Sequence, residues 1–403
     1  MVEILLGVLL GVILGTISGI IPGIHANTLA GVLLGLQVLL VGILGPLALA
    51  GTMFAALITH TFVDAIPSTF LGVPDTETCL SVLPAHALCL EGRGEEAVRI
   101  AALGSAGAIV LAVPLSVVCY LLLPALQPYL DWWIGVLLIG AAGYMIVTCD
   151  APGWALGIFC TSGILGSFAL HYSFLSLHTI GGGSAILMPL LSGLFGISVL
   201  LTATRGRIPD QRFDRIGMED RAIVRCSVFG TGAGIAVGWL PGLSTASANG
   251  VLATLVGYEK DRRGYILATN AANTANAFIG LAALFALSRM RNGVMAALAQ
   301  LPPQSLSALM VVGVLAAICA YLVTLSFSRY APLLNRIDTG LLNRGVIAFI
   351  VILCAILTGL FGLFILILAT AVGLAPRFIN LPAVYCMGSI MVPVILYSFG
   401  ILV

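Results

Sequence analysis

The sequence predicts an all-α polytopic integral membrane protein built from two repeats with broken or re-entrant helices. Three observations predict this fold. Of its 403 residues, 60% are hydrophobic and 8% are charged, with a mean hydropathy of +1.15, and so few charges cannot cover a soluble surface. Apolar runs of about 20 residues, the length of a bilayer-crossing helix, recur along the chain. Finally, one glycine-rich motif occurs twice.

The repeated motif sets the plan of the chain. Its first copy runs from Gly11 to Gly31 and its second from Gly230 to Gly250, and the two copies align without a gap. Glycines four apart lie on one helix face and allow another helix to come close. Each copy then reaches a Pro-Gly pair, at 22–23 and 241–242. Because proline removes a backbone donor and glycine accepts unusual dihedrals, each helix should break there.

The two breaks are the predicted substrate site. Broken backbone at membrane depth is tolerated only where protein or a wet cavity satisfies it. Two breaks at corresponding positions indicate a transporter site, with helix N-termini that aim free amides at an anion. The alternative is a structural kink packed by glycines. The predicted substrate-binding residues here are Gly23, His25, Asn27, Thr28, Gly242, Ser244, Thr245, Ser247 and Asn249.

The chain divides into an N-terminal repeat (1–204), an Arg-rich linker (205–225) and a C-terminal repeat (226–403). The linker holds six arginines and four acids, so the positive-inside rule predicts that it is cytoplasmic. A polar stretch at 66–88 indicates a second re-entrant or broken helix. Membrane elements are expected at 2–21, 24–45, 46–66, 100–124, 132–149, 152–171, 184–203, 306–327, 346–372 and 382–402.

Several polar residues lie within apolar surroundings. A charge there costs about 2.5 to 3.5 kcal/mol on insertion scales, so Asp64, Asp75 and Glu77, with Thr78, are the predicted ion-coupling residues for Na⁺ or H⁺. The alternatives are a tip that reaches water and ion pairs across the repeat interface. His60 lies four residues before Asp64. Two ligands are a weak metal signal, so a core hydrogen bond is favoured.

The second half adds further candidates. Asn270, Asn273 and Asn276 form a polar stripe near one helical face, which either lines the pathway or makes interhelical hydrogen bonds. Arg289 and Arg291 either bind a substrate carboxylate or phosphate bidentately or are cytoplasmic charges. All five are counted among the predicted substrate-binding residues.

Three places in the chain resemble the large membrane subunit of the tripartite tricarboxylate transporter family. They are the paired breaks, the stretch from Val73 to Ser105 with Leu83-Pro84-Ala85-His86 and Gly92-Arg93-Gly94, and Gly257-Tyr-Glu-Lys260 followed by Ala271 to Ala277. The resemblance implies an ion-driven carboxylate transporter of two inverted repeats. It also implies two partners, a small membrane subunit and a periplasmic or extracellular binding protein.

The chain departs from the family pattern at three places. Pro74-Asp75 stands where a Pro-Gly pair is usual, and Ser288 to Arg291 stand where the family has another Gly-Ile-Pro-Gly. Thr269 or Asn270 replaces an acidic position. These differences concern the substrate more than the fold.

The sequence favours an ion-coupled secondary transporter of small organic anions, di- or tricarboxylates, with alternating access at a midplane site between the breaks. The alternative is a flippase for polyprenyl phosphate or another lipid phosphate, because paired hairpins with arginines also suit a phosphate headgroup. An enzyme is not expected, since Gly242-Leu-Ser244-Thr-Ala246 lacks the last glycine of a nucleophile elbow.

The predicted location is the plasma membrane, with many passes through the bilayer. The nine cysteines are scattered and lie mostly in apolar runs, where small packing residues are expected. Nucleic acid is not an expected partner because no basic tail or patch is present. No cofactor is expected besides the coupling ion. The sequence leaves open whether the protein forms a homo-oligomer or needs the accessory subunits.

Overall fold

Helices make up all the regular structure in the part of the chain that the computed structural model describes. That part comprises residues 1–21, 26–72, 82–130, 133–176, 186–202, 209–239, 245–252, 256, 262–330, 339–381 and 383–401. Within it, eight helices are long and apolar enough to cross a bilayer, which confirms a helical, multi-pass membrane protein. These spans are Val2–Ile20, Pro46–Leu71, Gly94–Gln127, Pro152–His171, Asp220–Trp239, Arg262–Leu287, Leu306–Tyr330 and Asn343–Phe378.

The first half opens with α1 (Val2–Ile20), which ends just before the first Pro-Gly pair. One continuous run was expected over 24–45, but α2 (Ala26–Gly35) and α3 (Gln37–Leu44) occupy it, because Leu36 leaves the helical dihedrals. The other helices of this half are α4 (Pro46–Val63), α5 (Ala65–Leu71), α6 (Val82–Leu90), α7 (Gly94–Leu130), α8 (Ile134–Val147), α9 (Pro152–His171), a 3-10 turn at Ser173–Leu175, α10 (Leu187–Leu191), a π-helical segment at Ser192–Ile197 and α11 (Ser198–Thr202).

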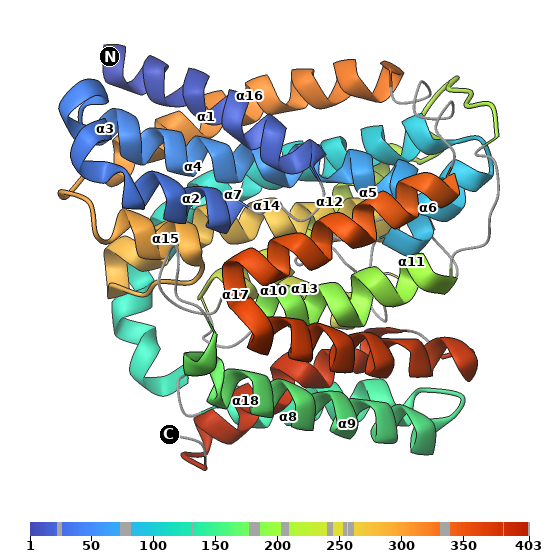
Figure 1. The fold of residues 1–403 in the computed structure, drawn as a ribbon. Helices are drawn as coiled ribbons and strands as arrows, with labels where there is room; N and C mark the ends of the chain where they lie inside the picture. Colours follow the sequence, from blue (N-terminus) through green and yellow to red (C-terminus); the bar gives the residue numbers. More distant parts are fainter. Residues whose placement is uncertain are drawn as a thin grey trace.

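The second half opens with α12 (Asp220–Trp239), which begins inside the stretch predicted as linker and ends just before the second Pro-Gly pair. The helix α17 (Thr339–Phe378) contains a bend at Gly359, whose φ of 65° and ψ of −156° suit only glycine. Figure 1 shows α17 as two legs that meet at a sharp corner. The remaining helices are α13 (Thr245–Leu252), α14 (Arg262–Leu287), α15 (Gly293–Leu298), α16 (Leu306–Tyr330), α17 (Thr339–Phe378), a 3-10 turn at Ala383–Met387 and α18 (Gly388–Ser398).

The glycines of the repeated motif hold two helix pairs in close contact. On α1, a Cβ built at Gly15 would lie 2.6 Å from the Ala56 carbonyl oxygen of α4. On α12, a Cβ at Gly234 would lie 2.5 Å from the Ala272 carbonyl oxygen of α14. In both pairs the contacts advance in the same direction along the two helices, so each pair is parallel. The absence of side chains at these glycines therefore permits both pairs.

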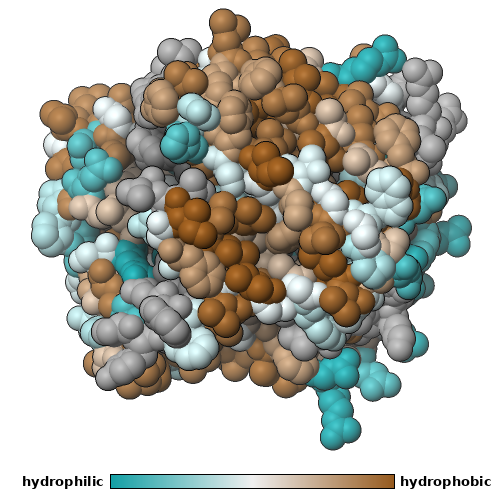
Figure 2. Space-filling view, turned by 90° about the horizontal axis from the view of Figure 1, so that it is seen from below, coloured by the Kyte–Doolittle hydropathy of each residue, from teal (hydrophilic) through white to brown (hydrophobic). Residues whose placement is uncertain are grey.

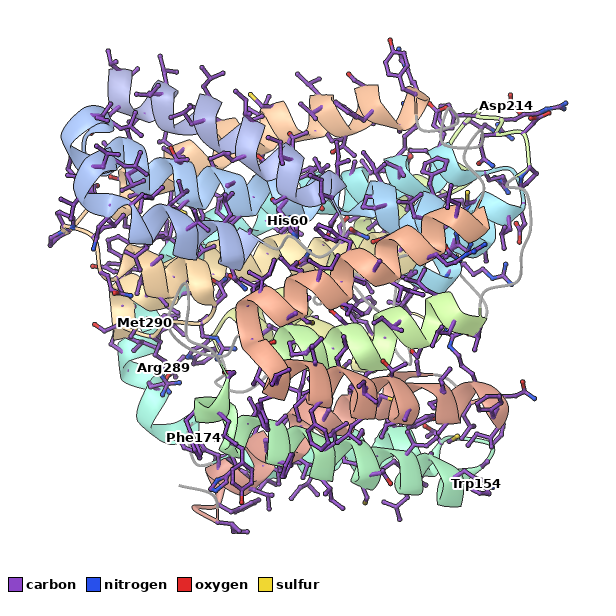
Figure 3. All side chains as sticks on the ribbon, viewed as in Figure 1. His60, Trp154, Phe174, Asp214, Arg289 and Met290 are labelled. Carbon is purple, nitrogen blue, oxygen red and sulfur yellow. The ribbon has the colours of Figure 1, made fainter. Side chains whose placement is uncertain are left out.

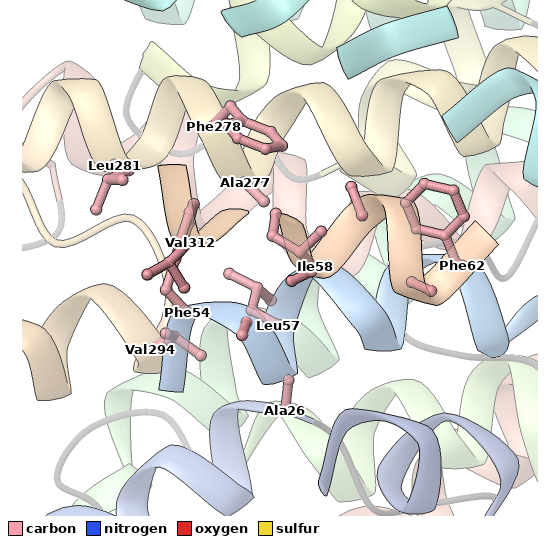
Figure 4. Packing of buried hydrophobic residues seen from close by; sticks show 14 of the residues in the cluster. Ala26, Phe54, Leu57, Ile58, Phe62, Ala277, Phe278, Leu281, Val294 and Val312 are labelled. Carbon is pink, nitrogen blue, oxygen red and sulfur yellow. The ribbon is translucent and has the colours of Figure 1, made fainter. Parts of the chain in front are cut away.

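The two pairs meet where α4 crosses α14. Phe54 and Phe278 make an edge-to-face contact with ring centroids 5.7 Å apart, and Thr61 and Thr274 share a hydrogen bond of 3.0 Å between their hydroxyls. From the first contact to the second, the residue number rises along α4 and falls along α14, so these two helices are antiparallel. Figure 4 shows the apolar side chains that fill the crossing, with Val312 of α16 among them.

A second apolar core joins α9 and α18 to the later part of α17, and α8 packs on α18. These helices lie together at one side of the molecule, opposite α1 and α16 (Figure 1). Seen from that side, hydrophobic residues dominate the middle of the surface and hydrophilic residues gather toward its left and right margins (Figure 2). Trp154, Ile164 and Tyr144 are among the exposed large residues of α8 and α9. Such a face suits contact with lipid.

Two further expectations can be compared with the helices. The stretch 66–88 contains α5 and α6, while residues 73–81 between them lie outside the described part. The run expected at 100–124 belongs to the longer α7. All eight cysteines in the described ranges are free, and four of them are buried.

Candidate functional site

A polar seam runs through the apolar centre of the molecule, where α4 crosses α14. Its titratable members are His60 and Asp64, which are 3% and 2% exposed. They lie one turn apart at the C-terminal end of α4, and Figure 3 shows His60 in the middle of the molecule. Buried polar groups of this kind need partners from other helices. The seam is built from those partners.

The carboxylate of Asp64 meets the asparagine stripe of α14. Asn273 Nδ2 lies 3.5 Å from Asp64 Oδ2, a long contact between the two halves of the chain. The neighbouring Asn270 turns another way and donates from Nδ2 to the Ile266 carbonyl of its own helix at 2.8 Å. Because a spacing of three residues falls short of a full helical turn, the stripe winds around α14. Its members therefore serve different neighbours.

The third asparagine of the stripe reaches the second break. Asn276 Nδ2 donates to the Thr245 hydroxyl at 3.1 Å, and Thr245 begins α13 just after the break. The Tyr265 hydroxyl donates to the Asn249 backbone carbonyl at 2.9 Å. Both Thr245 and Asn249 are fully buried. These two bonds hold the half-helix that follows the second break against α14.

His60 reaches the first break in a comparable way. Its Nδ1 lies 3.1 Å from the hydroxyl of Ser18, in the last turn of α1. The Ser18 hydroxyl also donates to the Gly15 carbonyl at 3.1 Å. The hydroxyl has one hydrogen, so the tautomer of His60 decides whether Ser18 donates to Nδ1 or accepts from it.

Asn27, at the start of α2, is engaged by the second half of the chain. Its Oδ1 accepts from the Val294 amide of α15 at 3.2 Å, and Asn292 caps the same helix by accepting from the Met295 amide at 2.9 Å. Two asparagines from different halves thus satisfy the first amides of α15. The side chain of Asn27 therefore ties the two halves together.

The two arginines after α14 lie near its C-terminal end and are half-buried. Arg291 donates from Nη2 to the Val237 carbonyl in the last turn of α12. A guanidinium at this position complements the negative end of the broken helix. Arg289 is labelled with Met290 at one end of the molecule in Figure 3. Neither arginine belongs to a second cluster of charges, which lies around Glu96 and the linker.

The opposite end of α14 carries that cluster, which we call the Glu96 clamp. Glu96 is 2% exposed and accepts from Arg93 at 2.6 Å, from Arg263 at 2.9 Å and from the Gly217 amide at 2.8 Å. Arg93 and Glu96 belong to the first half, Arg263 to α14 and Gly217 to the linker. One buried carboxylate thus joins three segments that are far apart in sequence.

The linker also covers the turn between α6 and α7. Gln211 accepts from the Gly94 amide at 2.7 Å and donates to the Cys89 carbonyl at 3.0 Å, and the Arg99 guanidinium lies 4.3 Å from the centre of the Phe213 ring. Beside these contacts is an open crevice of about 700 Å³. Asp214 marks this end of the molecule in Figure 3.

The length of α14 sets the depth of the seam. Its 26 residues span about 39 Å, enough to cross a bilayer. Asn273 lies about 16 Å from the clamp end and about 21 Å from the Arg289 end. Residues 264–288 contain no charged residue. The seam therefore lies near the middle of a membrane span.

Other predicted site residues fall outside the described part of the chain. For Thr28 and Ser247 only the backbone is described. The residues wholly outside it are Gly23, His25, Asp75, Glu77, Thr78, Gly242 and Ser244. In the ranges that are described, no three potential metal ligands come together.

Sequence reasoning did not find the Glu96 clamp, the Ser18–His60 contact or the role of Tyr265. The clamp left a faint signal, because Glu96 follows Arg93 by three residues and an arginine pair starts α14. Ser18 and His60 are far apart in the sequence, and nothing in either segment specifies the other. His60 was expected to make a core hydrogen bond, and its contact with Ser18 is of that kind.

Within the described ranges, the eight apolar spans and the crossing helices define a polytopic membrane protein with a buried polar seam at its centre. A family model described as "Tripartite tricarboxylate transporter TctA family" matches residues 5–388. The chain belongs to this family.

One curated relative is also similar. It is an uncharacterized protein of Methanocaldococcus jannaschii that is 30% identical over 247 residues. The matched region covers 60% of this chain and 60% of that relative. No solved structure matches the chain.

Proposed function

We propose that this protein is the membrane-spanning subunit of an ion-coupled secondary transporter for small organic anions, di- or tricarboxylates. Substrate binds at the midplane seam between the two broken helices, and alternating access exposes the seam to each side in turn. The observation that carries the proposal is the seam itself, in which Asp64–Asn273 and Asn276–Thr245 contacts lie near the middle of a membrane span. An ionisable side chain such as Asp64 is costly at that depth, and such residues mark substrate and ion pathways.

The proposal includes two inverted repeats. The glycine contacts support it, because α1 with α4 and α12 with α14 are both parallel pairs, while α4 and α14 are antiparallel. A rotation about an axis in the membrane plane relates two such pairs. The two Pro-Gly breaks and the stretch 66–88 are proposed as the broken or re-entrant parts.

The membrane topology follows from the charges. The linker and the Glu96 clamp gather arginines at one end of α14, so we assign that end to the cytoplasm. Arg289 and Arg291 then lie at the non-cytoplasmic end, where they would meet an incoming anion. They are proposed to bind a substrate carboxylate, with Arg291 acting from its position on the α12 terminus.

Partners follow from the family. We propose that a small membrane subunit and an extracytoplasmic binding protein complete the system, and that the binding protein delivers its anion to the Arg289 end. Asp64 is proposed as an ion-coupling residue, together with Asp75, Glu77 and Thr78. Thr28, Ser247 and the other residues of the breaks are proposed to line the substrate path.

A thermal-stability screen of the purified protein tests the substrate class. Citrate, malate, succinate and fumarate are compared with phosphate and a polyprenyl phosphate, each with and without Na⁺ at two pH values. A ligand at about 100 times its Kd stabilises the folded state by about 2.7 kcal/mol. Stabilisation by a carboxylate is expected. Stabilisation by the lipid phosphate alone would replace the transporter proposal with the flippase.

One variant pair locates the site. Replacing Asn276 with alanine removes the bond to Thr245, so we expect carboxylate affinity to fall about five- to tenfold, the effect of one lost hydrogen bond of about 1 to 1.5 kcal/mol. Asn343→Ala, near the start of α17, is the matched control and should bind as the wild type does. Equal affinities for the two variants would contradict a site at the seam.

A further inference from the structure

The two broken helices end in different charge environments at corresponding positions. In the aligned copies of the repeated motif, Ser18 and Val237 occupy the same position and each directly precedes the last glycine of its helix. The Val237 carbonyl accepts from Arg291, whereas the Ser18 hydroxyl meets His60. A guanidinium is always charged, but an imidazole ordinarily changes charge between about pH 5 and 8. The second break therefore holds a permanent positive charge and the first holds a group that can acquire one.

We propose that His60 is the proton-binding residue of the transporter, so that the coupling ion is a proton. When the imidazole of His60 takes up a proton from the aqueous side, the first break gains the positive charge that Arg291 supplies at the second. A dicarboxylate then meets two cationic ends, and it leaves when the proton is lost on the other side. This inference rests on the proposed transport of a carboxylate.

The hydrogen bonds of Ser18 support this assignment. Its hydroxyl lies 3.1 Å from Nδ1 of His60 and 3.1 Å from the Gly15 carbonyl oxygen, so it can donate to a bare Nδ1 or, with its hydrogen on Gly15, accept from Nδ1–H. Protonated His60 carries a hydrogen on Nδ1, which the serine oxygen accepts, so the bond to α1 persists when the imidazole gains a proton. His60 also lies one turn before Asp64, whose amide donates to the His60 carbonyl at 3.0 Å. A change of charge on the imidazole therefore acts on α1 through Ser18 and on the seam through the neighbouring Asp64.

Other charged and titratable groups are distributed along the helices that pack on α4. Asp64 lies one turn from His60, and the Glu3 carboxylate packs on Gly45 at the opposite end of α4. No such group occurs in α2, α3, α5 or α15, and His25 lies outside the described residues. Those with described side chains on α7, α14 and α16 are Glu95, Glu96, Arg99, Cys119, Tyr120, Arg262, Arg263, Tyr265, Cys319, Tyr321, Arg329 and Tyr330.

A proton count without substrate is the first test. The full-length protein in detergent is titrated from pH 8 to pH 5, and wild type is compared with His60→Gln and with His171→Gln. His171 is exposed at the end of α9 and provides a control substitution of the same kind outside the seam. His60→Gln should bind about one proton fewer than wild type. A His60→Gln curve identical to wild type would overturn the proposal.

The pH dependence of binding is the second test, and it uses wild type as well as the variants. Fumarate stays doubly ionised from about pH 6 to 8, so its own titration does not interfere. If binding takes up one proton, the Kd of wild type rises about tenfold per pH unit above the titration of His60. His171→Gln should behave like wild type, and His60→Gln should bind with a Kd that does not depend on pH.

The outcomes separate the two proposals. A pH-independent wild-type Kd, or a tenfold slope that survives in His60→Gln, would overturn the role of His60 while the transporter proposal stands. Loss of the slope in Asp64→Asn with its retention in His60→Gln would transfer the proton site to Asp64. If no carboxylate binds while His60→Gln still binds one proton fewer, the substrate proposal fails and the titrating His60 remains.

Discussion

Replacing Glu96 with glutamine should loosen the cytoplasmic end of the protein. The carboxylate is buried and accepts from Arg93, Arg263 and the Gly217 amide. Glutamine keeps one oxygen but replaces the other with an amide group that donates, and it removes the charge. The two guanidiniums then face a donor where they had an acceptor. The same substitution at Glu95, which pairs only with Arg99 in the described contacts, provides a matched control.

The magnitude follows from the exposure of the partners. Removing one member of a buried ion pair costs about 3 to 5 kcal/mol. Arg93 is 40% exposed and Arg263 is 23% exposed, so water recovers part of this loss. We expect Glu96→Gln to lower the free energy of unfolding by about 2 to 3 kcal/mol. Glu95 and Arg99 are 15% and 14% exposed, but Glu95 has one charged partner in the described contacts where Glu96 has two. Glu95→Gln should therefore cost less, about 1 to 1.5 kcal/mol.

Denaturant unfolding in detergent, followed by tryptophan fluorescence, measures the difference. The two variants share a helix, a side-chain size and a charge change, so a general effect of net charge cancels between them. Glu96→Gln should unfold at clearly lower denaturant concentration than Glu95→Gln. Free energies that agree within about 0.5 kcal/mol would refute the reasoning, because the clamp would then be worth no more than the single ion pair of Glu95 and Arg99.

Two further predictions concern close packing and burial. Gly234→Ala should destabilise the protein by about 1 to 3 kcal/mol, since the new Cβ meets Ala272 and Ala275 at 2.5 and 2.6 Å. A Cβ at Gly232 meets nothing within 4 Å, so Gly232→Ala should be neutral or stabilising by helix propensity. Equal thermal stabilities of the two variants would contradict the close packing. Burial raises the pKa of the Cys89 thiol to about 12, so about 1,000-fold fewer thiolates exist at neutral pH than for a pKa of 9. Maleimide should label Cys89 slowly in wild type and faster in Glu96→Gln, and an unchanged rate would show that the clamp does not shield it.

The helical framework could be predicted from the sequence because lipid imposes it. Spans such as α1, α9 and α16 follow directly from apolar runs of bilayer length, and α1 and α12 both end just before their Pro-Gly pairs. The sequence predicts the ends of helices less well where tertiary contacts determine them. Leu36 interrupts a run that is uniformly apolar, and α12 begins at Asp220 among charges that resemble a linker.

The candidate site was only partly predictable, because residue types identify polar positions but not their partners. Asn270, Asn273 and Asn276 were grouped by spacing, yet they reach their own helix, Asp64 and Thr245 in turn. Successive members point in different directions around the helix axis, and the neighbour found in each direction is a property of the packing. Likewise, nothing local to Asn27 specifies the α15 amide that it accepts from.

The two halves of the chain align with one offset in the motif helices α1 and α12 and with a different offset in their partner helices α4 and α14. Gly15 of α1 aligns with Gly234 of α12. Extended without a gap, that alignment would pair Ala56 of α4 with Ala275 of α14. The contacts instead pair Ala56 with Ala272, because these are the carbonyls that Gly15 and Gly234 meet. A shift of three residues keeps nearly the same helix face. The second half is therefore three residues shorter between its motif helix and its partner helix.

In the alignment that the contacts set, Asp64 corresponds to Gly280, and the two halves differ in the charge they place there. The first half supplies a carboxylate, whereas a Cβ built at Gly280 would lie 3.7 Å from Cβ of Arg291. The missing side chain thus leaves room for the guanidinium stem. Equivalent breaks with opposite charges cannot bind the same ligand equally well, because each favours ions of the other sign. In the proposed transporter, the permanent charge of Arg291 attracts the substrate at any pH, whereas the Asp64 side accepts the second carboxylate group only after His60 has taken up its proton.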